Sequence, residues 1–411
     1  MRVNGIIAEY NPFHNGHQYQ LEESLRLSEA DYTIVLMSGD FVQRGTPAAV
    51  DKYIRAEMAL RCGADMVLEL PVQYATSSAE TFAAGAVALL DRLGVVTHLC
   101  FGSEHGNVEL LKEMALLLSN EQPRYQSALK SFLHCGYTYP AARVEALTQC
   151  YPFLAKHRDI LASPNNILGI EYCKALIRRR SAILPLAVKR RGAGYHDSLT
   201  SSRFCSAFAI RQALYAGADI SQLLRNLPPD AARPLTQYLS RYFPMHPDIF
   251  SSALFYKLLA EKSVGYEKYS DVTTDLSNRI VKLLGSYTSY TKFCEILKTK
   301  DMTYTRISRC LLHILLNITQ EHMILGKEMD YAPYIRVLVF RKSAVSLFGA
   351  IKTHTSVPII TKLADAQKSL EGNALRLLQQ DIFCSELYRG TTAAQSDTTA
   401  LSEYSVPLVI I

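Results

Sequence analysis

Two histidines near the N-terminus have the residue type and the spacing for phosphate chemistry. His14 and His17 lie in the sequence His14-Asn15-Gly16-His17, directly after an apolar run that we expect to be a buried strand. At this spacing both imidazoles can lie on one face of a first helical turn. Beside a helix N-terminus they can donate hydrogen bonds to an α-phosphate and to a leaving pyrophosphate. We therefore predict a nucleotidyl-transfer site in which His14 and His17 are catalytic.

Two other interpretations of this pair compete with the catalytic one. Two histidines in a surface turn can be without function, and two histidines at this spacing could bind zinc. The position of the pair directly after the first predicted strand argues against an idle surface turn. No third Cys, His or carboxylate stands at helix spacing beyond His17, so we predict no metal site.

The elements that position the pair follow from the hydrophobic pattern. Apolar runs alternate with amphipathic segments, as in βαβ units around a parallel sheet. We predict a Rossmann-like, doubly wound α/β fold, and such sheets bind ligands at the carboxyl ends of their strands. The predicted strands are residues 3–8, 32–37, 66–70, 98–101 and 184–189, and the predicted helices are residues 16–28, 51–61, 77–93 and 170–178.

The second half of the chain has a different pattern, because helical periodicity dominates after Ser206. We therefore divide the chain into a doubly wound α/β domain at residues 1–205 and a mainly helical domain at residues 206–411. Residues 334–340 and 357–361 have the composition of strands. Residues 406–411 are apolar, and we expect them to dock on the domain or to form a final strand.

Composition limits the class of protein. The 411 residues are 48% hydrophobic with a net charge of +6, which allows a large core and is compatible with a nucleic-acid partner. No stretch reaches the length of a membrane span, and the N-terminus lacks a signal-peptide pattern. Nine cysteines without a Cys-x-x-Cys pair favour reduced thiols. We expect a cytoplasmic protein with no membrane partner.

Further blocks behind the histidine pair narrow the prediction. A strand followed by Asn-Pro-Phe-His-Asn-Gly-His resembles the HIGH-motif nucleotidyltransferases, which are related in fold to class I aminoacyl-tRNA synthetases. Five further blocks follow in order, and together with this motif they resemble the bacterial tRNA(Met) cytidine acetate ligase family. The similarity is specific over about residues 1–215 and looser beyond. The blocks are MSGDFVQRG (37–45), GADMVLELP (63–71), FGSE (101–104), PNNILGIEY (164–172) and GAGYHD (192–197).

The resemblance implies a two-step reaction. ATP and acetate would give acetyl-adenylate and pyrophosphate. The acetyl group would then pass to the exocyclic amine of the wobble cytidine of elongator tRNA(Met), giving N4-acetylcytidine. Free acetate, and not acetyl-coenzyme A, would be the acetyl source, and Mg²⁺ is expected with ATP.

The resemblance also assigns an ATP site, position by position. Gly102 would leave room for an adenine or ribose, and Asn165 or its neighbour Asn166 would read the ribose or base; the sequence does not separate these two. Arg190 and Arg191 would donate to phosphate. The assigned residues are Ile7, Ala8, Glu9, Tyr10, Asn11, Pro12, Phe13, His14, Asn15, Gly16, His17, Gln18, Tyr19, Gln20, Gly102, Asn165, Arg190 and Arg191.

One block, at residues 205–211, departs from the family pattern. Related enzymes carry a Ser/Thr-rich helix start that ends in Ile-Arg, and this chain has Phe208 where Ser or Thr is expected. Ser206 and Arg211 remain candidate contacts to the β- and γ-phosphates, and an ordinary capped helix is the alternative.

Three further polar residues lie near the predicted site. Asp40 ends the second predicted strand, and we interpret it as a turn cap in preference to a ligand of Mg²⁺ or water. Lys52 and Arg55 open the following helix. They could contact phosphate or tRNA, and a solvated helix face is an equal alternative.

Basic residues interleaved with aromatic residues in the second half favour tRNA binding. Lys and Arg supply phosphate contacts, and Tyr or Phe can stack on an unpaired anticodon base. The target cytosine would leave its stack to enter the ATP pocket. The clusters are Lys292-Phe293, residues 298–306 with Arg309, and residues 336–342.

Two other functions stay open from sequence. A small-molecule adenylyltransferase of the pantetheine-phosphate or nicotinamide-mononucleotide type would share the histidine site, but such enzymes are usually compact single domains. A non-catalytic RNA-binding protein could keep the fold, but it would have no reason to keep both His14 and His17. The oligomeric state does not follow from the sequence.

Overall fold

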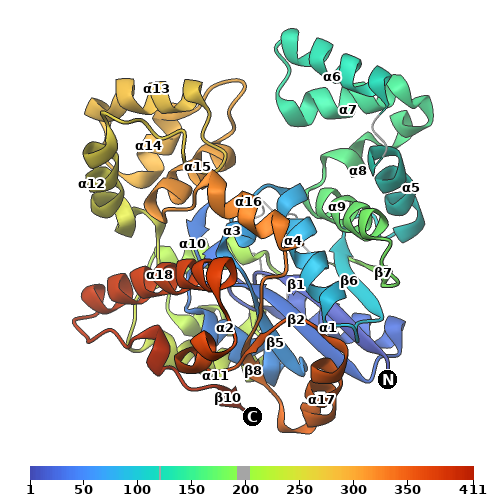
Figure 1. Ribbon diagram of the computed structural model, residues 1–411, viewed down its shortest axis with the longest axis vertical. Helices are drawn as coiled ribbons and strands as arrows, with labels where there is room; N and C mark the ends of the chain where they lie inside the picture. Colours follow the sequence, from blue (N-terminus) through green and yellow to red (C-terminus); the bar gives the residue numbers. More distant parts are fainter. Residues whose placement is uncertain (120–121, 192–203) are drawn as a thin grey trace.

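A central sheet organises the chain in a computed structural model that describes residues 1–119, 122–191 and 204–411. Its strand order is β10-β8-β5-β2-β1-β6-β7, and β9 also pairs with β8. Figure 1 shows helices around this sheet and two helical lobes that extend from the same end of the molecule. The strands are β1 (Val3–Ala8), β2 (Tyr32–Ser38), β5 (Met66–Leu70), β6 (His98–Ser103), β7 (Leu184–Lys189), β8 (Ile335–Phe340), β9 (Ile359–Ile360) and β10 (Val409–Ile410).

The first half of the chain forms the predicted parallel part of this sheet. β1 lies between β2 and β6 in parallel register, with Ile6 opposite Val35 and Cys100. β2 pairs parallel with β5, and β6 with β7. β1, β2 and β5 are buried along almost their whole length. Strands buried on both faces are read as continuous apolar runs, and this explains why the positions of these three were predictable. The α/β fold class is therefore confirmed.

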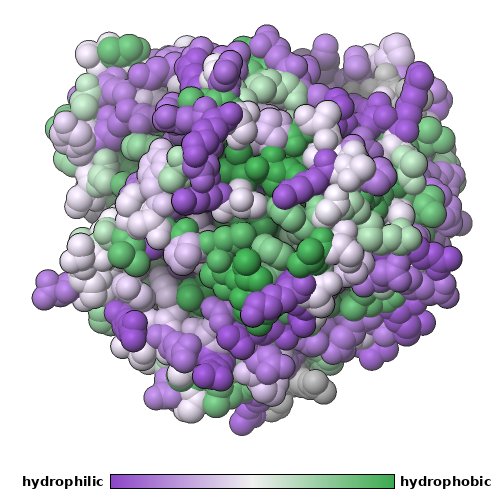
Figure 2. Space-filling view, turned by 60° about the horizontal axis from the view of Figure 1, so that its bottom comes forward, coloured by the Kyte–Doolittle hydropathy of each residue, from purple (hydrophilic) through white to green (hydrophobic). Residues whose placement is uncertain are grey.

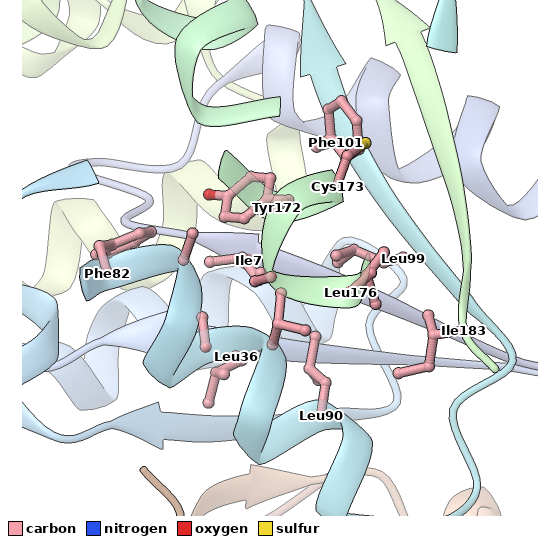
Figure 3. Close-up of a cluster of buried hydrophobic side chains, with 14 of the residues drawn as sticks. Ile7, Leu36, Phe82, Leu90, Leu99, Phe101, Tyr172, Cys173, Leu176 and Ile183 are labelled. Atoms are coloured by element: carbon pink, nitrogen blue, oxygen red, sulfur yellow. The ribbon is translucent and has the colours of Figure 1, made fainter. Parts of the chain in front are cut away.

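Helices cover both faces of the sheet, and consecutive strand residues supply the two cores. Ile6 packs into one core with α1 (Asn15–Ser28) and α2 (Lys52–Arg61). Ile7 points to the opposite face and packs against α4 (Ala79–Arg92) and α9 (Pro164–Arg179). Figure 3 shows this second core, in which Ile7 and Leu36 from the sheet meet Phe82, Leu90 and Leu176 from the two helices. This alternation is the two-residue period of a strand.

The remaining helices form the two lobes and cover the sheet. One lobe holds α5 to α8, and the other holds α12 to α15 around a third core (Figure 1). Beyond residue 206 the chain is mainly helical, as predicted. The helices are α5 (Val108–Ser119), α6 (Pro123–His134), α7 (Tyr139–Cys150), α8 (Arg158–Ala162), α10 (Ala207–Tyr215), α11 (Pro229–Leu239), α12 (Ser251–Glu261), α13 (Thr274–Leu283), α14 (Tyr290–Leu297), α15 (Tyr304–Leu315), α16 (Gln320–Glu328), α17 (Val345–His354) and α18 (Gly372–Gln395).

Strands from the second half complete the sheet of the first half. β8 pairs antiparallel with β5, and β10 and β9 pair parallel with β8. The predicted strands near residues 334–340 and 357–361 exist, and residues 409–410 form the final strand. The sheet is therefore not made from residues 1–205 alone, and the division at residue 205 stays a prediction.

The end of the molecule opposite the two lobes carries exposed apolar side chains. Val345 on α17 and Ile410 on β10 are examples, at the bottom of Figure 1. Figure 2 turns this end forward and shows hydrophobic side chains gathered near the middle of the face, with hydrophilic ones around them. Within the described residues, no helix has both the length and the apolar character needed to cross a membrane.

A buried ionic cluster joins the two halves of the chain. The Nζ of Lys52 on α2 lies 2.8 Å from Glu69 on β5 and 2.6 Å from Glu403. Arg336 on β8 contacts the same two carboxylates at 2.9 and 2.6 Å. Burial and Arg336 act to lower the pKa of Lys52, but Glu403, Glu69 and Asp40 outweigh them and raise it. Lys52 thus remains a buried cation because carboxylates surround it. These carboxylates come from distant parts of the chain.

Neither explanation offered for Lys52 and Arg55 from sequence is correct. Both side chains are fully buried, so the helix face is not solvated and neither residue is placed to contact phosphate or tRNA. Arg55 donates to the carbonyl oxygens of Val50 at 2.8 Å and Glu9 at 2.6 Å, and also to those of Ser38 and Gly39. Arg55 therefore fixes the ends of β1 and β2.

Candidate active site

A cavity of about 200 Å³ lies at the carboxyl ends of β1 and β6, where a sheet of this type is expected to bind ligands. A second cavity of about 30 Å³ adjoins it and shares His14, His17, Gln20, Gly102 and Arg190. The polar side chains that line the larger cavity are Glu9, Tyr10, Asn11, His14, His17, Gln20, Gln43, Arg44, Thr46, Asn165, Tyr172, Arg190, Ser206 and Arg211.

The loop that follows β1 is held by hydrogen bonds from several directions. The Asn11 side-chain oxygen accepts from the backbone N–H of Ala49 at 2.8 Å, and its carbonyl oxygen accepts from Arg211 at 2.6 Å. The carbonyl of Glu9 accepts from Arg55. Tyr10, between them, has a φ of 47°, a left-handed conformation that is uncommon for a residue other than glycine. The surrounding contacts therefore impose the shape of this loop.

The two histidines cap helix α1 with their own imidazoles. The Nδ1 of His14 accepts from the backbone N–H of Gly16 at 3.0 Å, and the Nδ1 of His17 accepts from the backbone N–H of His14 at 3.3 Å. The rings stack with their centres 3.8 Å apart. A neutral imidazole whose Nδ1 accepts carries its proton on Nε2. Each ring is therefore left with one Nε2–H donor for a ligand.

Burial keeps both imidazoles neutral. Desolvation, assisted by the charges of Arg190 and Arg211, lowers the pKa of His14 to about 3. Desolvation, His14 and Arg190 hold the pKa of His17 well below its usual value. At neutral pH the pair therefore supplies hydrogen-bond donors without net charge, and the positive charge on this wall of the cavity comes from the arginines.

Gly16 is required for the position of the first imidazole. A Cβ on Gly16 would lie 2.8 Å from Cε1 and 3.0 Å from Nδ1 of His14. A side chain at this position would therefore displace the ring of His14. Gly102 is less crowded, because its Cβ would lie 3.5 Å from Cγ of Arg190.

The start of α10 faces the larger cavity with Ser206, Ala207 and Phe208. The Ser206 hydroxyl accepts from the backbone N–H of Ala209 at 3.2 Å, so it caps the helix. Phe208 lines the cavity where a hydroxyl was expected, and the Arg211 guanidinium lies 6.0 Å from its ring centre. This wall therefore presents a helix N-terminus and an arginine, both suited to phosphate.

The structure separates Asn165 from Asn166. Asn165 lines the cavity, whereas Asn166 is buried and accepts from the Ser103 hydroxyl at 2.7 Å. Glu104 holds both, since its carboxylate accepts from the Asn165 side chain at 2.6 Å and from the Asn166 backbone N–H at 2.9 Å. Asn165 is therefore the amide that can reach a ligand.

Four of the predicted ATP residues line neither cavity. Pro12 and Phe13 are buried. Asn15 donates to the carbonyl of Arg225 at 2.8 Å, and Gln18 donates to Glu22 at 2.7 Å. These four lie in the chain segment of the site but are turned into the protein or along helix α1.

The other predicted residues line one cavity or both. Gly16, Tyr19 and Arg191 line the smaller one, where the Arg191 guanidinium lies 4.6 Å from the ring centre of Tyr19. The larger cavity is lined by Ile7, Ala8, Glu9, Tyr10, Asn11 and Asn165. Both cavities are lined by His14, His17, Gln20, Gly102 and Arg190. The block at residues 192–197 lies outside the described residues.

Sequence reasoning did not single out the hairpin of β3 (Phe41–Val42) and β4 (Thr46–Pro47) as part of the site. Its residues Gln43, Arg44 and Thr46 line the larger cavity. The carbonyl of Gly45 accepts from the hydroxyls of Tyr290 at 3.0 Å and Ser308 at 2.7 Å. The hairpin therefore ties the cavity to the lobe of α12 to α15. The sequence did hold a signal for this hairpin, because the block at residues 37–45 that resembles the family includes most of it.

The predicted RNA-binding clusters of the second half are only partly on the surface. Phe293 is in the third core, and Arg336 belongs to the buried ionic cluster, because α14 and β8 are packed on the sides that carry them. Phe340, the aromatic residue of the third cluster, is also buried. The prediction that these three residues contact RNA is therefore wrong. Lys292, Lys298 and Lys300 are exposed. Asp40 is buried and lines neither cavity. Its side chain accepts from the backbone N–H of Lys52 at 3.0 Å, so it binds the start of helix α2 and does not cap its own turn.

Comparison with known proteins gives the family. A family model described as HIGH Nucleotidyl Transferase matches residues 1–402. A tRNA(Met) cytidine acetate ligase from Caldanaerobacter subterraneus subsp. tengcongensis is 41% identical over 393 residues, which cover 94% of this chain and 95% of the relative. The chain belongs to the tRNA(Met) cytidine acetate ligase family. Another member of the family, from Halothermothrix orenii, is 36% identical and aligns with 100% of this chain and 99% of its own length.

Solved structures of the family agree in fold. A crystal structure of Thermotoga maritima TmcAL bound with alpha-thio ATP superposes with a TM-score of 0.90 at 31% identity, over 100% of both chains. The apo form of the same protein gives a TM-score of 0.93 at 32% identity, again over 100% of both chains. In the part of the chain that the structure describes, no group of three or more His, Cys, Asp or Glu side chains is placed to hold a metal ion.

Proposed function

We propose that this chain is an ATP-dependent ligase that forms acetyl-adenylate from acetate and ATP, and that it transfers the acetyl group to the wobble cytidine of elongator tRNA(Met). The pair of neutral, Nε2-protonated histidines beside Arg190 and Arg211 carries the proposal. Membership of the tRNA(Met) cytidine acetate ligase family supports the choice of substrates.

In the first step a carboxylate oxygen of acetate attacks the α-phosphorus of ATP, and pyrophosphate leaves. Negative charge grows on the phosphate oxygens as the leaving group departs. The Nε2–H groups of His14 and His17 donate to these oxygens, while Arg190 and Arg211 supply positive charge. Because the donors are fixed by the cap of α1, they need no rearrangement during the reaction. Loss of one such donor costs roughly 10²- to 10³-fold in rate.

The cavity suits the remaining parts of ATP. Gly102 keeps one wall open for the adenine or ribose, and the amide of Asn165 faces the same space. Mg²⁺ would enter with the triphosphate and neutralise its charge. Ser206 and the start of α10 would face the outer phosphates, with Phe208 in place of a second hydroxyl contact.

The second half of the chain would hold the tRNA. Exposed Lys292, Lys298 and Lys300 lie on the lobe of α12 to α15. This lobe binds the carbonyl of Gly45 in the hairpin whose neighbouring residues line the cavity. Lysines supply salt-sensitive phosphate contacts. Residues 1–205 would then act mainly in catalysis and residues 206–411 mainly in tRNA binding. The nine free thiols fit a reducing, cytoplasmic location.

The test is transfer of label from acetate to RNA. Purified protein is incubated with ATP, labelled acetate and elongator tRNA(Met), with reactions lacking ATP or containing labelled acetyl-coenzyme A as controls. We expect label in the tRNA only with ATP and acetate. Pyrophosphate release with a phosphorylated vitamin precursor would instead favour a small-molecule adenylyltransferase, and absence of ATP turnover would favour a non-catalytic RNA-binding protein.

Two variants test the mechanism. His14→Ala and His17→Ala should each reduce acetyl-adenylate formation about 100-fold or more, while tRNA binding persists. Normal ATP consumption in both variants would contradict the assignment of the histidine pair.

A further inference from the structure

The second step of the proposed reaction leaves a proton without a destination. The exocyclic amine of cytidine attacks the acetyl carbonyl, and the new amide keeps one N–H where the amine had two. The departing AMP carries away the electron pair of the broken C–O bond. A base within reach of the amine accelerates such a step by roughly 10²- to 10⁴-fold. The cavity should therefore contain a group that can accept a proton.

Most polar groups of the cavity cannot accept this proton. The Nδ1 atoms of His14 and His17 already accept backbone hydrogen bonds, and their Nε2 atoms carry protons. The cavity arginines have no acceptor atom. Burial, and then the charge of Glu9, raise the pKa of Tyr172, so its hydroxyl stays protonated.

Glu9 has the required chemistry. Among the described residues it is the only Asp or Glu that lines either cavity. It follows β1 directly, on the same loop as the two histidines, and its side chain is partly exposed. A carboxylate is also the group that pairs with the N4 amine of cytosine in base recognition.

The carboxylate of Glu9 is aimed by the protein. Its Oε1 accepts from the backbone N–H of Gln43 at 3.0 Å, and its own carbonyl is held by Arg55 at 2.6 Å. Within the described part of the chain, no protein group donates to Oε2. One oxygen thus fixes the carboxylate, and the other is left for a ligand in the cavity.

We propose that Glu9 is the general base of acetyl transfer, an inference that rests on the proposed function. The N4 atom forms its bond to the acetyl carbonyl carbon, its proton passes to Oε2 of Glu9, and the C–O bond to AMP breaks with its electron pair on the phosphate oxygen. Glu9 then returns the proton to water when the products leave.

Glu9→Gln separates the two steps. Gln keeps an oxygen that can accept from the Gln43 N–H but cannot take up a proton. Acetate-dependent exchange of labelled pyrophosphate into ATP measures the first step, and single-turnover transfer from preformed acetyl-adenylate to elongator tRNA(Met) measures the second. Because Glu9 also lines the ATP cavity, exchange can fall somewhat. We expect transfer to fall about 100-fold or more and exchange to fall far less, so that the two losses differ by at least about 10-fold. Retained exchange also shows that the variant is folded.

Two further variants sharpen the comparison. Glu22→Gln removes a carboxylate from helix α1 outside both cavities and should leave both steps unchanged. Glu9→Asp keeps a shorter carboxylate and should transfer at a rate between those of wild type and Glu9→Gln.

Three outcomes would overturn the inference. Transfer by Glu9→Gln at the wild-type rate would show that Glu9 is not the general base. Equal loss of exchange and transfer would show that Glu9 acts in the binding of ATP or Mg²⁺. If Glu9→Gln does not fold, Glu9→Asp gives the test. Intact exchange by this variant, together with transfer no faster than the uncatalysed reaction, would exclude a role for the carboxylate as a base. A wild-type protein that transfers no label would instead overturn the proposed function itself.

Discussion

The imidazole of His17 accepts a hydrogen bond from the backbone N–H of His14, so each histidine of the pair helps to hold the other. His14 in turn caps the N–H of Gly16 and stacks on the ring of His17. The same contacts that begin helix α1 therefore set the tautomer of both rings. A helix cap and a pair of phosphate donors are one structure here.

The acid stability of the protein should depend on His14. Its pKa is about 3 in the folded protein and about 6.5 in an unfolded chain. Between these values only the unfolded chain binds the proton, so the free energy of unfolding falls as the pH drops below about 6.5. His14→Asn keeps a side chain suited to capping and removes this proton site. Urea unfolding at pH 7.5 and pH 5 should show a smaller loss of stability in the variant, and equal losses would contradict the buried neutral imidazole.

Gly16→Ala should impair catalysis without unfolding the protein. The added Cβ meets the ring of His14 at 2.8 Å, so the imidazole must move, while alanine is a better helix former than glycine by about 1 kcal/mol. We expect acetyl-adenylate formation to fall about 10-fold or more with little change in thermal stability. Gly349→Ala on α17 is the matched control, because nothing lies within 4 Å of its Cβ. A wild-type rate for Gly16→Ala would show that the ring position is not required.

Glu403→Ala should destabilise the fold strongly. It leaves Lys52 and Arg336 in the interior with one carboxylate fewer, and breaking a buried ion pair costs about 3 kcal/mol or more. The lowered pKa of Glu403, about 2, means that this stabilisation is present above the carboxyl's unfolded pKa of roughly 4.3 and is lost as pH falls through about 2. Denaturant unfolding at pH 7 measures the effect. Exposed Glu371→Ala is the control, and equal stability of the two variants would contradict the prediction.

The exposed lysines before α15 should contribute to tRNA affinity through charge. Lys298→Gln with Lys300→Gln should weaken tRNA binding and lower the slope of log K against log salt by up to about 0.7 to 0.9 for each phosphate that is no longer neutralised. Acetate-dependent pyrophosphate exchange should not change. The pair Lys362→Gln and Lys368→Gln makes the same change of charge on another exposed segment. An equal effect from both pairs would indicate a general charge effect without a local tRNA site.

Local sequence signals predicted the sheet and the histidine pair. The runs at residues 3–8, 66–70 and 184–189 are apolar and end at turn residues, so their strands have the predicted bounds. Lys52 and Arg336 could not be placed in this way, because their burial depends on Glu403, which is far away along the chain. The hairpin at residues 41–47 was missed because strands of two residues are too short to show a period.

Strand β10 and Glu403 also bear on how the protein is made. A ribosome that has finished β5 must still translate the whole second half before β8 and β10 can close that edge of the sheet. Until then the nascent chain exposes an unpaired strand edge, which is a template for aggregation. A chain released before residue 403 would bury Lys52 and Arg336 with only one of the two carboxylates that they share. Premature termination late in the message should therefore give an unstable product that is open to proteolysis, and not a working catalytic fragment.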